Sequence, residues 1–393
     1  MRPPPLASDQ DGPLVFVHPS DELYGADRML LEMVEAARAD PRVPGLEVWL
    51  PTDLEHPAPE LSLCGVLEQR GVTVRHLDVP VLRRAYRTPT GLARLLGRGA
   101  HLLAELRRTR ASAVYCTSSA TLLAAPVARL ARVPQVLGHV QEIWTRADRA
   151  ALTLPALACG RLLAISGAAA GSLPPGLLGR TAVVPNGTPD PGTPVPLAGR
   201  TGGLRYVVAS RWNGWKGHAT LLAAWDEARV AGVLTVLGGP PASGERTDVP
   251  RLVAALAEPG SVEVVGEVAD PSPWLEAADV VVVPSDRPEP FGLVAIEALA
   301  RARPVVASAG GGLVDIVTPE VDGWLFPPGD VTALAAVLRR LDRPGVTAAG
   351  VRARETYEAR FTEREFAERW REVVLGEVVP GGVVPGGVVP GGE

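Results

Sequence analysis

The residues VVVVPSDRPEPFGLVAIEALA, numbers 280–300, contain one complete structural unit of the fold. Four valines in succession are typical of a strand that is buried on both faces, as in a parallel sheet. A polar, proline-rich loop follows, and the apolar spacing after Phe291 predicts a helix. Units of this kind, a strand followed by a loop and a helix, build parallel sheets that carry helices on both faces.

The same alternation extends in both directions along the chain. Apolar runs that predict strands lie at 13–17, 46–50, 72–77, 113–116, 135–140 and 162–165, and again at 206–210, 234–238, 262–265, 280–284, 305–308 and 323–326. Between the two series, PNGTPDPGTPVP (185–196) is dense in proline and glycine and breaks the alternation.

These observations predict two α/β domains, 13–185 and 201–357, joined by a hinge linker at 186–200. In such folds ligands bind at the carboxyl ends of the strands, so we expect a cleft between the two domains. Residues 377–393 contain three copies of VVPGG, and we expect them to form a disordered tail.

Composition excludes several classes of protein. The net charge of −5 over 393 residues argues against a nucleic-acid binder, and no apolar run is long enough to span a membrane. Cys64, Cys116 and Cys159 are far apart and lack the CxxC spacing of zinc or redox sites. The start of the chain lacks a signal-peptide core, so we expect a cytoplasmic protein with reduced thiols.

The loop and helix within 280–300 carry the strongest chemical signal. Glu289 lies just before the predicted helix, and Glu297 lies about two turns inside it. The first N–H groups of a helix lack partners, so those of Phe291, Gly292 and Leu293 would face a bound anion or hydroxyl. Glycine at 292 also permits a close approach to the backbone. The two carboxylates can accept hydrogen bonds from sugar and ribose hydroxyls.

The E-x7-E spacing of Glu289 and Glu297 resembles the signature of the retaining GT-B glycosyltransferases of family 4, the glycosyltransferase group 1 type. The resemblance extends from about residue 13 to 375. It implies two Rossmann-like domains facing each other across a cleft, a nucleotide-diphosphate sugar as donor, and a hydroxyl acceptor that is a glycan, a lipid-linked compound or a small molecule. In that family the first glutamate faces the donor sugar and the second holds the nucleotide ribose.

A second segment, SRWNGWKG (210–217), resembles the family's G-R-x4-K-G loop, although Ser210 replaces the glycine. Arg211 and Lys216 match its cations, and Lys216 is the only lysine in the chain. A diphosphate leaving group gains negative charge as the glycosidic bond breaks, and two fixed cations stabilise that transition state. Because these two cations supply positive charge, we expect neither a metal nor a cofactor.

Other correspondences follow from the resemblance alone. Gly25 would bring backbone N–H groups onto the diphosphate, and His139 would hydrogen-bond to a hydroxyl of the donor sugar. Gly266 and Val268 belong to a strand and loop that would receive the nucleotide base. Residues 358–376 resemble the family's terminal helix, which crosses back to the first domain.

Two alternatives stay open: a nucleotide-sugar epimerase of GT-B fold, and a nucleotide-sugar-binding protein without catalytic activity. The first domain offers no transferable acceptor motif, but residues 75–110 hold nine arginines against Asp78 and Glu105, beside a leucine-rich face. Such a segment is a candidate for peripheral contact with an anionic inner membrane face. Alternatively, its leucines pack on the sheet and its arginines are solvated.

Overall fold

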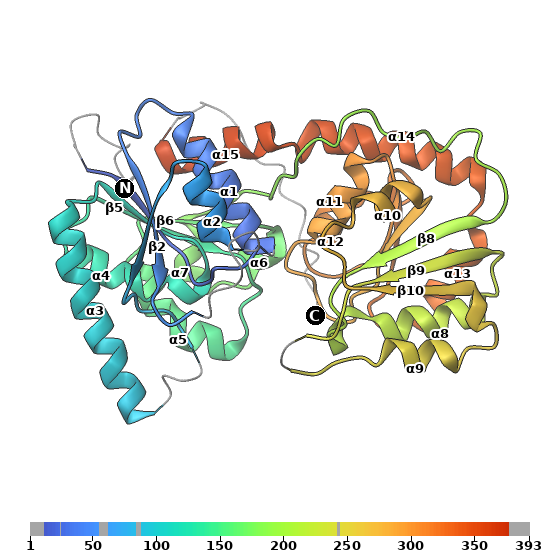
Figure 1. Ribbon diagram of the computed structural model, residues 1–393, viewed down its shortest axis with the longest axis horizontal. Helices are drawn as coiled ribbons and strands as arrows, with labels where there is room; N and C mark the ends of the chain where they lie inside the picture. Colours follow the sequence, from blue (N-terminus) through green and yellow to red (C-terminus); the bar gives the residue numbers. More distant parts are fainter. Residues whose placement is uncertain (1–11, 24, 55–61, 84–87, 242–243, 377–393) are drawn as a thin grey trace.

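The computed structural model describes residues 12–23, 25–54, 62–83, 88–241 and 244–376. These residues form two parallel-sheet domains side by side (Figure 1). The predicted α/β class with two Rossmann-like domains is confirmed. The expectation for the repeat at 377–393 falls outside the described residues.

The first domain contains a seven-stranded sheet of order β3-β2-β1-β4-β5-β6-β7. Its strands are β1 (Leu14–Val17), β2 (Leu46–Pro51), β3 (Thr73–Leu77), β4 (Ala113–Cys116), β5 (Gln135–Val140), β6 (Arg161–Ala164) and β7 (Thr181–Val183). Its helices are α1 (Gly25–Arg38), α2 (Leu63–Gln69), α3 (Pro89–Thr109), α4 (Ala124–Leu130), α5 (Arg146–Leu157), α6 (Gly167–Gly171) and α7 (Pro175–Leu178).

The second domain contains a six-stranded sheet of order β10-β9-β8-β11-β12-β13. Its strands are β8 (Leu204–Ala209), β9 (Gly232–Leu237), β10 (Val262–Gly266), β11 (Val280–Val283), β12 (Val305–Ser308) and β13 (Gly323–Phe326). Its helices are α8 (His218–Ala228), α9 (Val249–Ala254), α10 (Ser272–Ala277), α11 (Leu293–Ala300), α12 (Leu313–Ile316), α13 (Val331–Arg340) and α14 (Arg343–Arg360). In Figure 1, α8, α9 and α13 cover one face of this sheet, and α10 and α11 cover the other.

The last helix of the described chain, α15 (Glu363–Leu375), packs on the first domain after α14 has run along the second (Figure 1). Its buried Phe366, Trp370 and Val374 join a core that also contains Phe16 and Tyr115. Full burial of such side chains contributes about 1.5–3 kcal/mol each. The C-terminal segment therefore connects the two domains a second time, in addition to the linker.

Two arginines hold the linker on the second domain. Arg303 is fully buried, and its guanidinium donates to the carbonyls of Val195, Arg301 and Glu276. Arg200 donates to the carbonyl of Ala277 at 2.9 Å and to other acceptors at the end of α10. These contacts fix the end of the linker at residues 195–200 on the second domain. No helix among the described residues is long and apolar enough to cross a membrane.

Two carboxyl groups, those of Glu32 on α1 and Glu363 on α15, lie close together where these helices pack. Burial and the nearby Glu363 carboxylate raise the pKa of Glu32 well above its ordinary value. A raised pKa in the folded state means that this group stabilises the fold fully at acid pH, and that the stability is lost as pH rises toward neutrality.

We therefore expect Glu32→Gln to leave the free energy of unfolding unchanged near pH 4.5 and to raise it by about 1 kcal/mol or more near pH 8. Denaturant unfolding at both pH values measures this difference. The exposed Glu368 on α15 supplies the control, Glu368→Gln. An equal change at both pH values for Glu32→Gln would contradict the prediction.

Candidate functional site

Two loops of the second domain meet at the carboxyl edge of its sheet. One follows β8, the other follows β11, and the two strands are neighbours in the sheet. The Lys216 ammonium donates to both carboxylate oxygens of Glu289, with Nζ 3.0 Å from Oε1 and 2.8 Å from Oε2. The Ser285 hydroxyl donates to Oε2 at 2.8 Å, and Glu289 is only 8% exposed. The structure thus brings together two of the predicted site residues, 73 positions apart in the sequence.

The position of Lys216 depends on the glycine that follows it. Gly217 has φ +75°, and a Cβ at this residue would lie 1.8 Å from the carbonyl oxygen of Pro284. The loops also share a hydrogen bond from the Asp286 N–H to the Trp215 carbonyl at 2.8 Å. The ammonium of Lys216 lies 4.2 Å from the centroid of the Trp215 ring, where the π-face attracts a cation. Close backbone packing and this ring therefore fix the cation.

The backbone of Glu289 is supported by the glycine-rich loop after β12. Gly311 pairs with Glu289, and the N–H of Gly312 donates to the Glu289 carbonyl at 2.7 Å. A Cβ at Gly311 would lie 2.0 Å from that carbonyl oxygen. Glycine is therefore required at 311 by contact with the Glu289 loop.

Helix α11 begins beside the Lys216–Glu289 pair and also contacts the first domain. Gly292 caps it with φ +112°, Phe291 is buried, and Leu293 is its first residue. A Cβ at Gly25, the first residue of α1, would lie 2.9 Å from the Leu293 Cδ1 atom. The N-termini of α1 and α11 therefore approach each other from opposite domains.

Two further hydrogen bonds join the domains in the same region. The Ser166 hydroxyl donates to the carbonyl of Pro290 at 2.6 Å. The N–H of Gly167 donates to the Asp315 carboxylate at 2.8 Å. The loop that carries Glu289 is thus held from both sides of the interdomain boundary.

Glu297 lies one turn into α11 and faces the first domain. Its carboxylate is 3.7 Å from a guanidinium nitrogen of Arg28 on α1, and 17% of its side chain is exposed. Burial raises its pKa. The carboxylate is therefore partly desolvated but remains accessible to solvent.

The remaining predicted donor residues lie on loops of the second domain. Arg211 lies two residues after the end of β8 and is exposed. Gly266 ends β10 with φ +94°, and no described atom lies within 4 Å of a Cβ placed on it. Val268 is half-buried in the loop after it. Open space beside Gly266 is compatible with close approach of a ligand, and the predicted roles of all three residues stay predictions.

His139 lies inside the first domain, with its ring fully buried against the sheet face that α15 covers. Its Nδ1 is 3.2 Å from the Tyr115 hydroxyl, and its Nε2 has no hydrogen-bond partner among the described residues. Burial lowers its pKa to about 3, so the ring is neutral. In this arrangement no part of the ring is accessible to a sugar, and the predicted contact requires a rearrangement that exposes it.

A buried polar network at the carboxyl end of β1 was not anticipated from the sequence. His18 contacts the Thr117 hydroxyl through Nδ1 at 2.7 Å and the Asp27 carboxylate through Nε2 at 2.9 Å. Ser20 donates to the same carboxylate. Because the Thr117 hydroxyl donates to the Val17 carbonyl, it accepts from His18. The network fixes the loop between β1 and α1, and a histidine at the end of a predicted strand was its signal.

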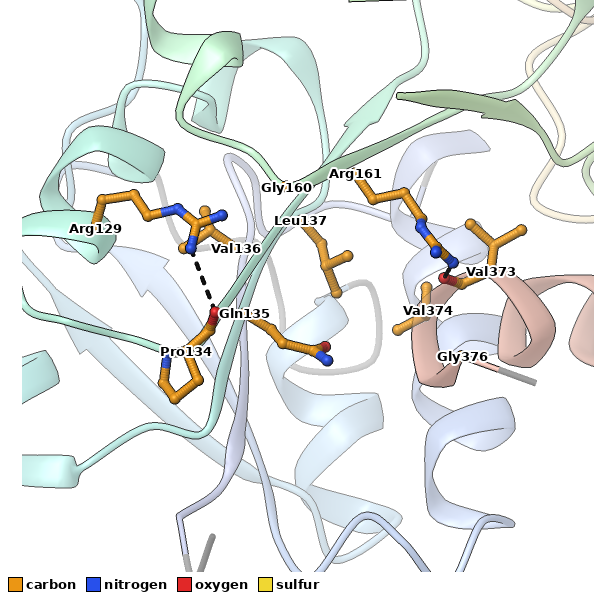
Figure 2. Close-up of a pocket in the computed structure, with 10 residues that line it drawn as sticks. All are labelled: Arg129, Pro134, Gln135, Val136, Leu137, Gly160, Arg161, Val373, Val374 and Gly376. Carbon is orange, nitrogen blue, oxygen red and sulfur yellow. Dashed lines mark hydrogen bonds between the residues drawn. The ribbon is translucent and has the colours of Figure 1, made fainter. Parts of the chain in front are cut away.

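A small pocket lies in the first domain at the amino ends of the strands. Residues from the starts of β5 and β6 and from the end of α15 line it (Figure 2). In Figure 2 the arginines turn toward backbone carbonyls, Arg129 to Pro134 and Arg161 to Val373. Ligands of parallel sheets bind at the carboxyl ends of the strands, and this pocket lies at the amino ends. Among the described residues, no cluster of three or more His, Cys, Asp or Glu side chains could hold a metal.

Part of the chain is similar in sequence to a known protein family and to curated proteins. Residues 204–343 match the family model described as Glycosyl transferases group 1. A D-inositol 3-phosphate glycosyltransferase of Kribbella flavida is 42% identical over 126 residues, 30% of this chain and 29% of that protein. The same enzyme from Xylanimonas cellulosilytica is 40% identical over 166 residues, 41% of this chain and 38% of that protein. The matched part thus spans well under half of these curated relatives.

Solved structures resemble the chain over nearly its whole length. Anabaena HepE in complex with UDP and glucose has a TM-score of 0.74 at 22% identity, covering 92% of this chain and 98% of that one. HepE in complex with UDP-glucose has a TM-score of 0.75 at 19% identity, covering 93% and 100%. The sucrose-phosphate synthase of Thermosynechococcus elongatus has a TM-score of 0.67 at 22% identity, covering 92% and 98%. At these identities the likeness shows the fold.

Proposed function

We propose, from the premise that residues 204–343 are a glycosyltransferase group 1 domain within a GT-B fold, that the chain transfers a sugar from a nucleotide-diphosphate donor to a hydroxyl acceptor. The contact between Lys216 and Glu289 at the N-terminus of α11 carries this proposal. It brings together a cation, a carboxylate and the N-terminal N–H groups of α11 at the interdomain boundary.

The proposed reaction retains the configuration of the sugar. The bond between C1 and the diphosphate oxygen breaks, and Lys216 and Arg211 stabilise the negative charge that develops there. The acceptor oxygen forms a bond to C1 on the same face, and its proton passes to the departing phosphate oxygen. Glu289 orients the sugar through its hydroxyls. His139 takes part only once its ring becomes accessible.

A donor assay without acceptor tests this function against its alternatives. UDP-glucose is the first probe because the similar HepE structures contain UDP and glucose. Slow hydrolysis, or transfer to an added hydroxyl compound with the anomer retained by NMR, supports the proposal. Inversion at C2 would identify an epimerase. Binding of several nucleotide sugars without turnover would identify a non-catalytic binding protein.

The reaction is proposed to proceed without a divalent metal, since in this proposal Lys216 and Arg211 supply the positive charge at the leaving group. We expect an excess of EDTA to change the turnover rate by less than about twofold, because fixed protein charges replace the ion. Initial rates with EDTA, and after re-addition of manganese or magnesium, measure the effect. Strict dependence on either ion would contradict the charge assignment.

The acceptor side includes a candidate membrane contact on α3. Leu102 and Leu106 are buried against the first domain, whereas Leu92 and Leu96 in its N-terminal half are 54% and 69% exposed. The leucines of the C-terminal half thus pack on the domain, whereas the N-terminal half leaves two leucines exposed. Some of the positive charge is neutralised, because Arg75 pairs with Glu105 and Arg98 with Asp53. We propose that the exposed half of α3 contacts an anionic membrane peripherally, on the cytoplasmic side.

In a flotation experiment we expect binding to anionic vesicles and not to neutral ones, with loss of binding at high salt. Leu92→Ser with Leu96→Ser should reduce binding about tenfold, because two exposed apolar side chains are removed from the contact. Charge reversal of Arg83, Arg84 and Arg87 should do the same; the last two lie outside the described residues. Leu154→Ser is the control, since Leu154 is 76% exposed on α5. If the protein floats to the same extent with anionic and with neutral vesicles, the proposed membrane contact is overturned.

A further inference from the structure

Arg28 connects the first domain to a carboxylate on the second. It lies one turn after Gly25 in α1, and its Nη1 is 3.7 Å from the Oε1 of Glu297, one turn after Leu293 in α11. The adjacent approach of Gly25 to Leu293 fixes the distance between the two helices. The Arg28 side chain is 51% exposed, so its guanidinium reaches Glu297 from the solvent side of the boundary.

Charges from three elements surround the Glu297 carboxylate. Arg28 on α1 and Arg301, the residue after α11, favour its ionised form, whereas Asp270, in the loop before α10, and burial oppose it. Arg301 already donates to the Glu297 carbonyl at 3.0 Å and to the Ser272 hydroxyl at 2.6 Å. Arg301, the nearby cation of the second domain, therefore donates its hydrogen bonds to other acceptors. Arg28 of the first domain supplies the remaining positive charge near the Glu297 carboxylate.

A carboxylate accepts hydrogen bonds from a diol through both oxygens only when it is ionised. The gap of 3.7 Å is too long for a hydrogen bond, so the pair leaves lone pairs of the carboxylate unused. Arg28 can thus stabilise the charge without occupying the acceptor positions that a ribose would need. Because the pair crosses the domain boundary, its strength depends on how closely the domains approach.

We propose that Arg28 is a positioning residue for the nucleoside half of the donor: across the domain boundary, it holds Glu297 ready to accept the hydroxyls of a ribose. The proposal rests on the proposed function, in which Glu297 binds the nucleotide ribose. It assigns the first domain a part in recognition of the donor, through a residue that contacts Glu297 rather than the nucleotide. A larger distance between the two domains would separate the pair and weaken ribose binding.

Calorimetric titration with UDP, repeated from about pH 5.5 to about pH 8.5, tests this role. Arg28→Ala should weaken UDP binding about three- to tenfold near pH 6 and less at higher pH. The sign follows from linkage: loss of the cation lets the carboxyl hold its proton to higher pH, so binding fails earlier on acidification. Arg28→Lys should restore most of the affinity.

Two further variants separate this role from a merely structural one. Arg28→Ala should have no additional effect when Glu297 is already replaced by glutamine, because the charge it stabilises is absent. Arg38→Ala, on the last turn of the same helix and 43% exposed, should leave the affinity and its pH profile unchanged. Loss of affinity that is equal at every pH, or that persists in the Glu297→Gln background, would overturn the inference.

The proposed function fails in a distinguishable way. If the unaltered chain binds none of UDP, GDP and ADP at any of these pH values, the nucleotide-binding function is overturned, and the inference with it. If the unaltered chain binds UDP and Arg28→Ala binds it with the same pH profile, only the role of Arg28 is overturned.

Discussion

Replacement of Lys216 by alanine is expected to reduce turnover about a hundredfold or more, because the cation that stabilises the departing diphosphate is lost. The ammonium also neutralises Glu289, which is 8% exposed and would retain only the Ser285 hydroxyl as a side-chain partner among the described residues. The free energy of unfolding should therefore fall by about 1–3 kcal/mol. Single-turnover rates and denaturant unfolding measure the two effects separately.

Arg211→Ala provides the matched comparison. Arg211 is exposed at the start of the same loop, so its removal should reduce turnover by a similar factor with little change in stability. Near-normal turnover in either variant would remove that residue from the diphosphate site. Loss of turnover in Lys216→Ala that is fully explained by unfolding would also contradict the assignment.

Gly217→Ala is expected to have the second large effect, although it removes no functional group. The new Cβ would lie 1.8 Å from the Pro284 carbonyl oxygen, so the loops after β8 and β11 must separate and Lys216 must leave Glu289. Turnover should fall about a hundredfold, since a displacement of about 1 Å suffices for a loss of that size. The free energy of unfolding should fall by about 2–4 kcal/mol.

Gly202→Ala separates contact from backbone strain. Gly202 has φ +82°, close to the +75° of Gly217, but no described atom lies within 4 Å of a Cβ placed on it. Gly202→Ala should lower the free energy of unfolding only by the cost of a left-handed backbone conformation, about 1–2 kcal/mol. Turnover should be preserved. Equal effects of the two substitutions on turnover would show that close packing of the loops does not position Lys216.

The strands were predictable from local patterns with one exception. Twelve of the strands in the described residues lie within about a residue or two of the apolar runs that predict them, from β1 to β13. The exception is β7, a three-residue edge strand whose side chains are all only half-buried. An edge strand of that length produces no long buried run, so its sequence resembles a loop.

Motifs in the sequence pointed to some residues of the candidate site. Contacts between residues that come together only on folding could not be predicted. The resemblance pointed to Glu289, Glu297, Arg211 and Lys216, and the structure places Lys216 in contact with Glu289. It gave no indication of Arg28, since an ion pair across a domain boundary leaves no spacing pattern in either helix. The contacts of His18 with Thr117 and Asp27 were missed because Thr117 is 99 positions away.

The sequence by itself determined the order of strands and helices and the presence of two α/β domains, because these depend on neighbours along the chain. Only the tertiary structure decided which face each residue occupies and what it contacts. It buried His139 beneath α15, and it required glycine at 217 and 311, where a side chain would overlap another loop. Such contacts join segments far apart in the chain, and the space between them is set by packing of the whole core.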